Sequence, residues 1–221
     1  MDRLLLEQHY DRILSVNRTK ILSGGAGDDY LKNVRNDNRM SLVVLIRITP
    51  EISGKIVSCI EEIRKIEPEL YFYPAGDFHI TVMDILKGEE GRNIPKNVEE
   101  YIDCIRKSSA KISPFPIEFK GLTASDNAVM VKGYYQEELL WFREDLRESF
   151  AQRGLKLEER YKTISSHVTI SRLPERYQNE EALLNYIKQP RAFGTMNVHS
   201  MEVSFHNWYD TRKEVLSVIN L

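Results

Sequence analysis

The chain has 221 residues, 42% hydrophobic and 29% charged, a composition typical of soluble globular proteins and unlike that of disordered or fibrous ones. This length suits one large domain or two small lobes with a buried core. Lys and Arg number 31 and Asp and Glu 33, so the net charge of −2 disfavours a protein that binds long nucleic acid through a basic surface. No apolar run approaches the length of a membrane span, and three N-terminal leucines are too few for a signal peptide.

The first forty residues predict a helical extension. Residues 4–14 and 30–34 have the spacing of short helices, and the segment between them, 23–29, is rich in glycine. This turn is only superficially similar to a phosphate-binding loop, because no Gly-Lys-Ser/Thr follows it and no strand precedes it. We therefore interpret it as a flexible turn.

From residue 41 the hydrophobic pattern predicts alternating strands and helices. Strands are indicated by β-branched apolar runs, and helices by apolar residues at spacings of three and four. In chain order we expect a strand at 42–48, a helix from 50 to 67, strands at 71–73 and 78–86, a helix at 98–105, strands at 114–119 and 128–132, a helix at 139–150, a strand at 165–172, a helix at 179–187, and strands at 198–205 and 215–219.

Each half of this region repeats the order strand, helix, strand, helix, strand, which indicates an internal duplication. Short connections between several strands favour an α+β fold of antiparallel-rich sheets with helices outside, rather than a doubly wound parallel sheet. We predict a helical extension over residues 1–40 and a domain over 41–221 made of two lobes, 41–120 and 121–221.

The two cysteines, Cys59 and Cys104, form no CxxC pair, and each lies within an apolar helical pattern. Clustered cysteines at short spacing would indicate a metal site or a disulfide framework. We therefore expect both thiols to be reduced and buried in the core of a cytoplasmic protein.

The motif His-x-Thr occurs twice, once at residues 79–81 and once at 167–169. With five histidines and eight threonines in the chain, two chance matches are expected only about one time in a hundred. Both copies lie in β-forming sequence, and side chains two apart on a strand point to the same face. Each half therefore offers an imidazole and a hydroxyl on one face of a sheet. The alternative is that each histidine is a structural residue of a half-buried strand.

A pseudo-twofold axis between the halves would make the two motifs face one another across a cleft. A neutral imidazole on one side of a phosphate can take a proton from water, and an imidazolium on the other side can protonate the leaving oxygen; each step is typically worth about 10²–10⁴ in rate. The ordinary histidine pKa near 6.5 allows both states at neutral pH. The threonine hydroxyls would donate hydrogen bonds to the non-bridging oxygens, and this chemistry requires no metal.

The paired motifs resemble those of the 2H phosphoesterase superfamily, which includes 2′-5′ RNA ligase-like proteins and RNA 2′,3′-cyclic phosphodiesterases. The resemblance covers roughly residues 41–210. It implies a bilobal, duplicated α+β fold with a central cleft, and metal-independent hydrolysis, without a cofactor, of a cyclic or 2′-5′ phosphodiester on RNA ends or small nucleotides. By position, it assigns His79 and His167 as the acid–base pair, and Thr81 and Thr169 as the phosphate-binding hydroxyls.

Four further residues are candidates for substrate contacts. Arg47 and Lys132 occupy similar places on strands of the two halves, where each either binds phosphate or extends to solvent. Arg172 follows His167 by five positions, so regular pleating places it on the opposite face of the strand. Tyr73 precedes the first motif and either stacks on a base or packs in the core.

Other polar and aromatic residues are weaker candidates for the border of the cleft: Tyr71, Tyr161, His206 and Trp208. Asp77 lies two residues before the first motif, where it either orients the histidine or binds a metal. Ser165 occupies the matching place before the second motif, so a symmetric metal site is not supported, and we predict no metal.

Three functions fit these residues: phosphodiester hydrolysis, binding of a nucleotide or RNA end without turnover, and RNA 2′-5′ end joining. In each of them the expected partner is a small nucleotide or an RNA terminus. The sequence leaves the exact substrate, the oligomeric state, any protein partner and the role of residues 1–40 open.

Overall fold

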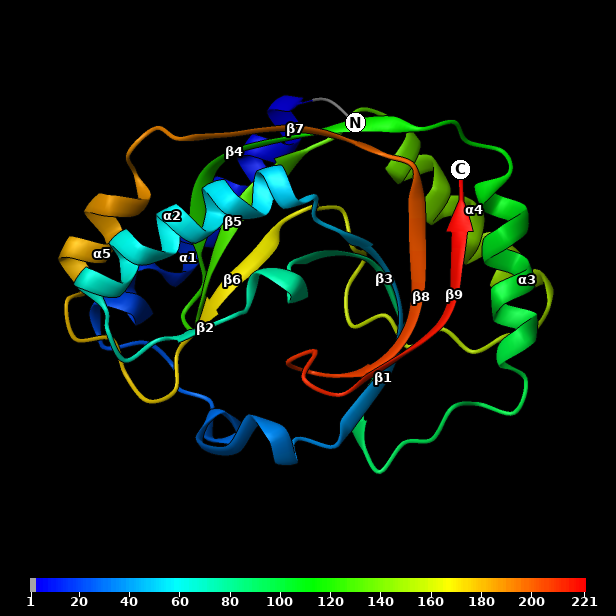
Figure 1. The fold of residues 1–221 in the computed structure, drawn as a ribbon, viewed down its shortest axis with the longest axis horizontal. Helices are drawn as coiled ribbons and strands as arrows, with labels where there is room; N and C mark the ends of the chain where they lie inside the picture. The colour runs from blue at the N-terminus through cyan, green and yellow to red at the C-terminus, as the bar shows by residue number, and fades with distance from the viewer. Residues whose placement is uncertain (1–2) are drawn as a thin grey trace.

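Strands and helices alternate through residues 3–221, which this computed structural model describes (Figure 1). The helices are α1 (Arg3–Leu22), η1 (Asp29–Asn36), α2 (Pro50–Ile66), η2 (Ala75–Asp77), α3 (Val98–Ser109), α4 (Glu138–Gln152) and α5 (Glu180–Ile187). The strands are β1 (Arg39–Arg47), β2 (Tyr71–Phe72), β3 (His79–Glu90), β4 (Phe115–Ala124), β5 (Ala128–Tyr134), β6 (Val168–Arg172), β7 (Ala192–Val198), β8 (Ser200–Asn207) and β9 (Lys213–Asn220). Within this described part, no helix combines the length and the apolar character needed to cross a membrane.

The strands form one curled antiparallel sheet in the order β7-β4-β5-β6-β3-β1-β8-β9, with β2 paired to β6. Its two central strands, β3 and β6, pair only at Ile80 and Val168. Everywhere else the neighbouring strands share longer ladders, such as that of β1 with β8 over Met40–Leu45. The sheet is therefore two half-sheets joined by a narrow seam, and the α+β class and the antiparallel pairing are as predicted.

The expected boundary between lobes at residue 120 does not coincide with the division of the sheet. Strands β8 and β9 belong to the second half of the sequence, yet β8 pairs with β1 and extends the half-sheet that contains β3. Strand β4 pairs with β5 in the opposite half-sheet. Chain-order lobes cannot describe this arrangement, because the chain crosses the seam before and after β2, again after β3, and again after β7.

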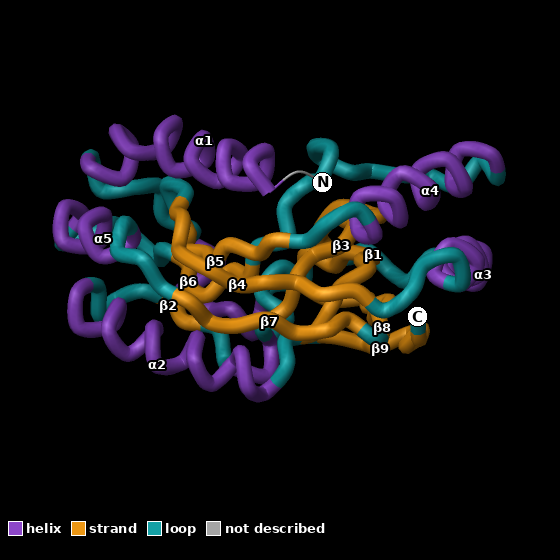
Figure 2. Tube along the Cα trace, turned by 90° about the horizontal axis from the view of Figure 1, so that it is seen from above, coloured by secondary structure: helices purple, strands orange, loops and turns teal. Residues whose placement is uncertain are grey.

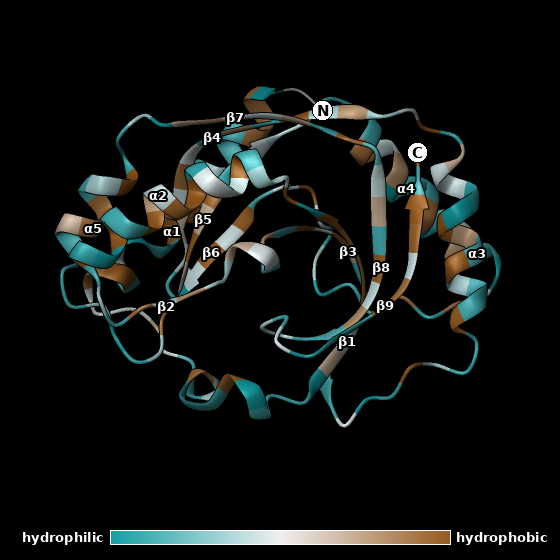
Figure 3. Ribbon diagram, viewed as in Figure 1, coloured by the Kyte–Doolittle hydropathy of each residue, from teal (hydrophilic) through white to brown (hydrophobic). Residues whose placement is uncertain are grey.

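The helices cover the outside of the curled sheet, with α1 and α4 on one side of the strands and α2 on the other (Figure 2). Helix α2 begins as the sequence predicts, at Pro50 after Thr49, and its isoleucines face the core. Brown hydrophobic segments of the helices turn toward the strands in Figure 3, and teal ones turn outward. Burial of this apolar stripe fixes each helix on the sheet.

Helix α1 is longer than predicted and is part of the core. Its Leu6 and Tyr10 are fully buried, and it contacts β4 and β5. The Tyr10 hydroxyl donates to the carbonyl of Gly133 at 2.8 Å and accepts from the amide of Ser166 at 3.1 Å. Ser166 immediately precedes His167, so the N-terminal helix supports the backbone of the second motif.

The glycine-rich turn after α1 is a packing element. The Gly25 backbone has a φ of +77°, and a Cβ there would lie 2.5 Å from the carbonyl oxygen of Asp126. A Cβ on Gly27 would collide with the backbone of Glu175. Only glycine allows both the left-handed conformation and these close approaches. The glycines of this turn are therefore explained by packing, and no phosphate-binding role is needed.

We expect Tyr10→Phe to lower the free energy of unfolding by about 1–3 kcal/mol, because it leaves buried backbone groups near Ser166 without their partner. Urea denaturation followed by circular dichroism measures the change. The matched control is Tyr161→Phe, since the Tyr161 side chain is 64% exposed. Equal stability of the two variants would show that the Tyr10 hydroxyl does not anchor the motif.

Candidate active site

The two His-x-Thr motifs meet at the seam of the sheet. Ile80 is paired with Val168, so the residues that flank them lie on the other face, with His79 across from Thr169 and Thr81 across from His167. The two histidines are diagonal neighbours in this arrangement, a relation that separates Cβ atoms by about 7–8 Å. That spacing leaves room for a phosphate between the rings.

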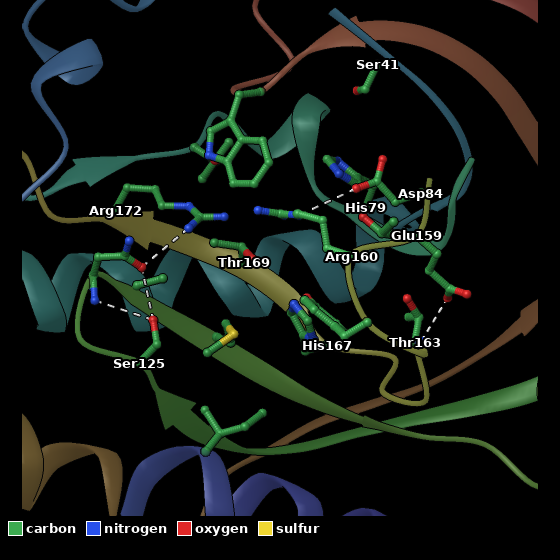
Figure 4. A pocket seen from close by; sticks show the side chains of 18 of the residues that line it. Ser41, His79, Asp84, Ser125, Glu159, Arg160, Thr163, His167, Thr169 and Arg172 are labelled. Carbon is green, nitrogen blue, oxygen red and sulfur yellow. Dashed lines mark hydrogen bonds and ion pairs between the residues drawn. The ribbon is translucent and has the colours of Figure 1, made fainter. Parts of the chain in front are cut away.

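All four motif side chains line one pocket of about 430 Å³ (Figure 4). The histidine rings are half-buried, while Ile80 and Val168 between them are fully buried. The predicted juxtaposition of the motifs is therefore present, and it arises from one antiparallel pairing. Residues far apart in the sequence reach the same cavity because β3 and β6 are adjacent.

Each motif strand carries a bulge immediately after its threonine. In β3 the register against β1 shifts between Thr81 and Met83, and in β6 the register against β5 shifts between Thr169 and Ser171. A bulge inserts one residue and reverses which face the following side chains occupy. The residue five positions after each histidine therefore returns to the pocket face.

These residues are Asp84 and Arg172, and both line the pocket. The expectation that Arg172 lies on the opposite face is wrong, because that argument assumed regular pleating through Ile170. The same spacing in the other motif would have indicated Asp84. The duplicated scaffold thus presents an acidic side chain, Asp84, in one half and a basic side chain, Arg172, in the other.

The two imidazoles have different hydrogen-bond partners. His79 Nδ1 lies 2.7 Å from the carbonyl oxygen of Asp77, which can only accept, so Nδ1 carries the hydrogen and Nε2 keeps its lone pair. His167 Nδ1 lies 2.9 Å from the Ser165 hydroxyl, which can donate or accept. His79 is therefore fixed as one tautomer, whereas the partner of His167 suits either protonation state.

Burial and the neighbouring His206 lower the pKa of His79 to about 4. Burial, together with the guanidinium of Arg172, lowers the pKa of His167 to about 3. Both rings are therefore neutral at pH 7. A phosphate anion between them would favour the charged forms and raise both pKa values.

A fully buried arginine, Arg143 of α4, joins the two motif strands from behind. Its Nε donates to the carbonyl of Val82 at 2.7 Å, and its Nη2 donates to the carbonyls of Thr81 at 3.2 Å and Ser165 at 2.7 Å. Burial lowers the pKa of this guanidinium. One side chain thus links the backbone of β3 to the segment that precedes His167.

The aromatic candidates divide between the pocket and the surrounding core. Those that line the pocket are Tyr73, Tyr161 and Trp208. Tyr71 instead makes edge contacts with the rings of Tyr73 and Tyr209. Tyr73 is buried in the pocket wall, whereas Tyr161 is exposed at its mouth.

Two predicted phosphate contacts lie elsewhere. Arg47 is bound to Glu202 at 2.9 Å and to Asp210 at 2.6 Å, so its charge is already neutralised. Lys132 pairs with Glu7 of α1 at 2.7 Å and lines a different pocket. Alternation along the strands could not reveal these partners, because each comes from a distant segment.

Apart from Tyr161, sequence reasoning missed the pocket residues of the loop between α4 and β6. This loop supplies Glu159, Arg160 and Thr163 to the lining, and Arg160 reaches Asp84 at 3.9 Å. Arg160 also lies over the Trp208 ring, with 4.4 Å from its Cζ to the ring centroid. No local motif marks this loop, because its residues reach the pocket only through the fold.

Among residues 3–221, no group of three or more His, Cys, Asp or Glu side chains is placed to hold a metal.

Comparisons with known proteins point to one family. The model of the 2′-5′ RNA ligase superfamily matches residues 50–208. The crystal structure of TT0787 from Thermus thermophilus is 15% identical, with a TM-score of 0.60 over 82% of this chain and 97% of that one. E. coli LigT complexed with 3′-AMP is 14% identical, with a TM-score of 0.58 over 82% of this chain and 98% of that one. A comparison with curated protein sequences gives no match.

We expect Arg143→Met to lower the free energy of unfolding by about 3–5 kcal/mol, because it removes the donors of several buried carbonyls. Denaturation in urea measures the change. Arg153→Met is the control: Arg153 binds Asp103 at the surface, and its loss should cost less than about 1 kcal/mol. Similar losses in both variants would contradict a bridging role for Arg143.

Stability should also fall as the pH is lowered from 6.5, because histidines of the unfolded chain take up protons that the buried rings do not. For His79 this loss continues down to about pH 4, and it amounts to at most about 1.4 kcal/mol per pH unit. Denaturation at pH 6.5 and 5.5 should show a loss about 1 kcal/mol smaller in His79→Asn than in the wild type. An equal loss in both proteins would disprove the depressed pKa.

Proposed function

The chain belongs to the 2′-5′ RNA ligase superfamily, and on that premise we propose that it is a metal-independent phosphodiesterase. Its substrates are 2′,3′-cyclic or 2′-5′ phosphodiester bonds of RNA ends or small nucleotides. The observation that carries the proposal is the placement of both His-x-Thr motifs around one pocket, across the single pairing of Ile80 with Val168.

The hydrogen bonds of the histidines support the roles that we propose for them. His79 is the general base, since its Nδ1 donates to the carbonyl of Asp77 and its Nε2 is free to take a proton. His167 is the general acid, which a bound phosphate anion charges and whose Nδ1–H the Ser165 hydroxyl can accept. Water attacks phosphorus, its proton passes to His79, and the ribose oxygen leaves with the proton of His167.

The remaining pocket residues bind the anion and orient the nucleoside. Thr81 and Thr169 donate to the non-bridging oxygens, on which charge increases in the transition state. Arg172, on the same face as Thr169, adds a fixed positive charge that attracts the phosphate. Trp208 and Tyr73 supply aromatic surface for a base. Cys59 and Cys104 are buried free thiols, which supports the placement of this activity in the cytoplasm.

Hydrolysis and the two alternatives differ in their products. A binding module would hold the same nucleotide without product, and an RNA ligase would join 2′,3′-cyclic and 5′-hydroxyl ends. Mass spectrometry after incubation with a panel of cyclic nucleotides and RNA ends separates the three, since only hydrolysis adds the mass of one water. Recovery of unchanged ligand, or of joined RNA, would replace the proposal with the corresponding alternative.

His79→Ala and His167→Ala should each lower kcat/KM for 2′,3′-cyclic nucleotides by at least about 10², the loss expected when an acid or base is removed. The double variant should lose little more than either single one, since the two groups act in one step. His199→Ala is the control, because His199 is exposed and lies outside the pocket. Activity should persist in EDTA, and unchanged rates in both single variants would refute the mechanism.

A further inference from the structure

A third histidine lies in the same pocket. His206 of β8 lines the cavity, is only 6% exposed, and stands beside His79 with 5.7 Å between the ring centroids. It belongs to no His-x-Thr motif and reaches the site from the half-sheet edge beyond β1. The mechanism of two histidines gives it no task, so its presence needs its own explanation.

A buried carboxylate fixes the ring of His206. The Nδ1 atom lies 2.7 Å from Oδ1 of Asp210, whose side chain is fully buried. Asp210 has a φ of +58° in the turn between β8 and β9, a conformation that aspartate tolerates better than most residues. Because Asp210 holds Nδ1, Nε2 is the ring atom left to meet a ligand in the pocket.

The turn that carries Asp210 is clamped from the N-terminal segment. It projects into the concave side of the sheet in Figure 1 and is hydrophilic in Figure 3. The Tyr209 hydroxyl binds the Asp28 carboxylate, and Asn207 donates to the carbonyl of Asp37 at 3.0 Å. A turn held at both flanks presents His206 in one orientation, which a functional side chain requires.

The ionic network around Asp210 contains more carboxylates than permanent cations. Asp210 also binds Arg47 at 2.6 Å and Lys213 at 2.9 Å. These two cations have one further carboxylate each, Glu202 for Arg47 and Asp77 for Lys213. The network therefore holds three carboxylates and two permanent cations, and an imidazolium at position 206 makes it neutral. On the pocket side, Asp84 faces Arg160, which offsets its charge.

We propose that His206 is a third substrate-binding imidazole, which donates a hydrogen bond from Nε2 to a phosphoryl oxygen beside His79 when a phosphate group is bound. Asp210 is its positioning residue. The inference deepens the proposed function and rests on it for the identity of the substrate. It gives the site a third imidazole contact beside the proposed base, which the two motifs alone do not provide. The ligand class is a phosphate group of a nucleotide or an RNA end.

The first test uses the unaltered protein and inorganic phosphate. In histidine-selective ¹⁵N NMR, titration with phosphate should shift the Nε2 signal of His206, and Nε2 should carry a hydrogen in the phosphate complex. A His206 ring whose Nε2 signal phosphate leaves unmoved, or whose Nε2 carries no hydrogen in the complex, overturns the proposal. Neither NMR observation requires a variant to fold or the protein to turn over a substrate.

The second test compares His206→Gln with His199→Gln as the matched control. His206→Gln should weaken phosphate binding and lower kcat/KM for a 2′,3′-cyclic nucleotide by about tenfold or more, the effect of losing a charge-assisted hydrogen bond. Retention of both within twofold in a folded His206→Gln overturns the role of His206. If the wild type binds phosphate through His206 but cleaves no phosphodiester, the proposed function fails while the anion contact stands.

Asp210→Asn separates orientation from a purely structural role. In this variant the Nε2 signal of His206 should lose its response to phosphate, because the carboxylate that orients the ring is gone. Phosphate affinity should fall to the level of His206→Gln. A His206 whose Nε2 signal still responds to phosphate in Asp210→Asn, with normal affinity, shows that Asp210 does not position it, and overturns that part of the proposal.

Discussion

One buried guanidinium holds the two halves of the pocket in register. Strands β3 and β6 share a single ladder pair, Ile80 with Val168, which alone is a weak connection between two half-sheets. Arg143 strengthens this seam by donating to carbonyls on both sides of it, at Thr81 and at Ser165. A charged group in the protein interior is costly unless its hydrogen-bond donors are satisfied. Arg143 is tolerated because the short ladder between β3 and β6 leaves backbone carbonyls that accept its hydrogen bonds.

The same seam converts a symmetric scaffold into an asymmetric site. Both motifs use the same strand geometry and the same bulge, but the residue five positions on is Asp84 in one half and Arg172 in the other. The histidine partners differ as well, a carbonyl for His79 and a hydroxyl for His167. Two imidazoles with the same ordinary pKa therefore have different surroundings, a difference that the proposed acid–base catalysis requires.

The sequence was sufficient for the features that depend on local periodicity. Alternation placed His79 and Thr81 on one face, short connections between strands indicated the α+β fold, and Thr49 with Pro50 marked the start of α2. The failures have one cause, which is contact between distant segments. A correct prediction for Arg172 required knowledge of a bulge that depends on pairing with β5. A correct prediction for Arg47 required knowledge of its carboxylate partner in the turn after β8.

The same limit left His206 only a weak candidate for the border of the cleft, and it left the role of the first forty residues open. No local signal connects Tyr10 with Ser166, or Asp28 with Tyr209, because these pairs are defined only when the sheet has closed. The division of the sheet likewise does not follow chain order, since β8 pairs with β1, on the far side of the second half-sheet in the sequence. Hydrophobic patterns with a period of two residues, or of about three and a half, do not indicate which distant strands will pair.

The return of β8 to β1 has a consequence for how the protein reaches its native state. During synthesis β1 is made early, but β8, its neighbour on the outer side, is made only after about 150 further residues. The delay is about ten seconds or more at typical synthesis rates. Until then β1 exposes an apolar strand edge, the kind of surface that recruits chaperones or aggregates. Completion of this half-sheet must therefore wait for β8, and it requires the closure of a long loop, whose entropic cost is absent from the formation of a helix.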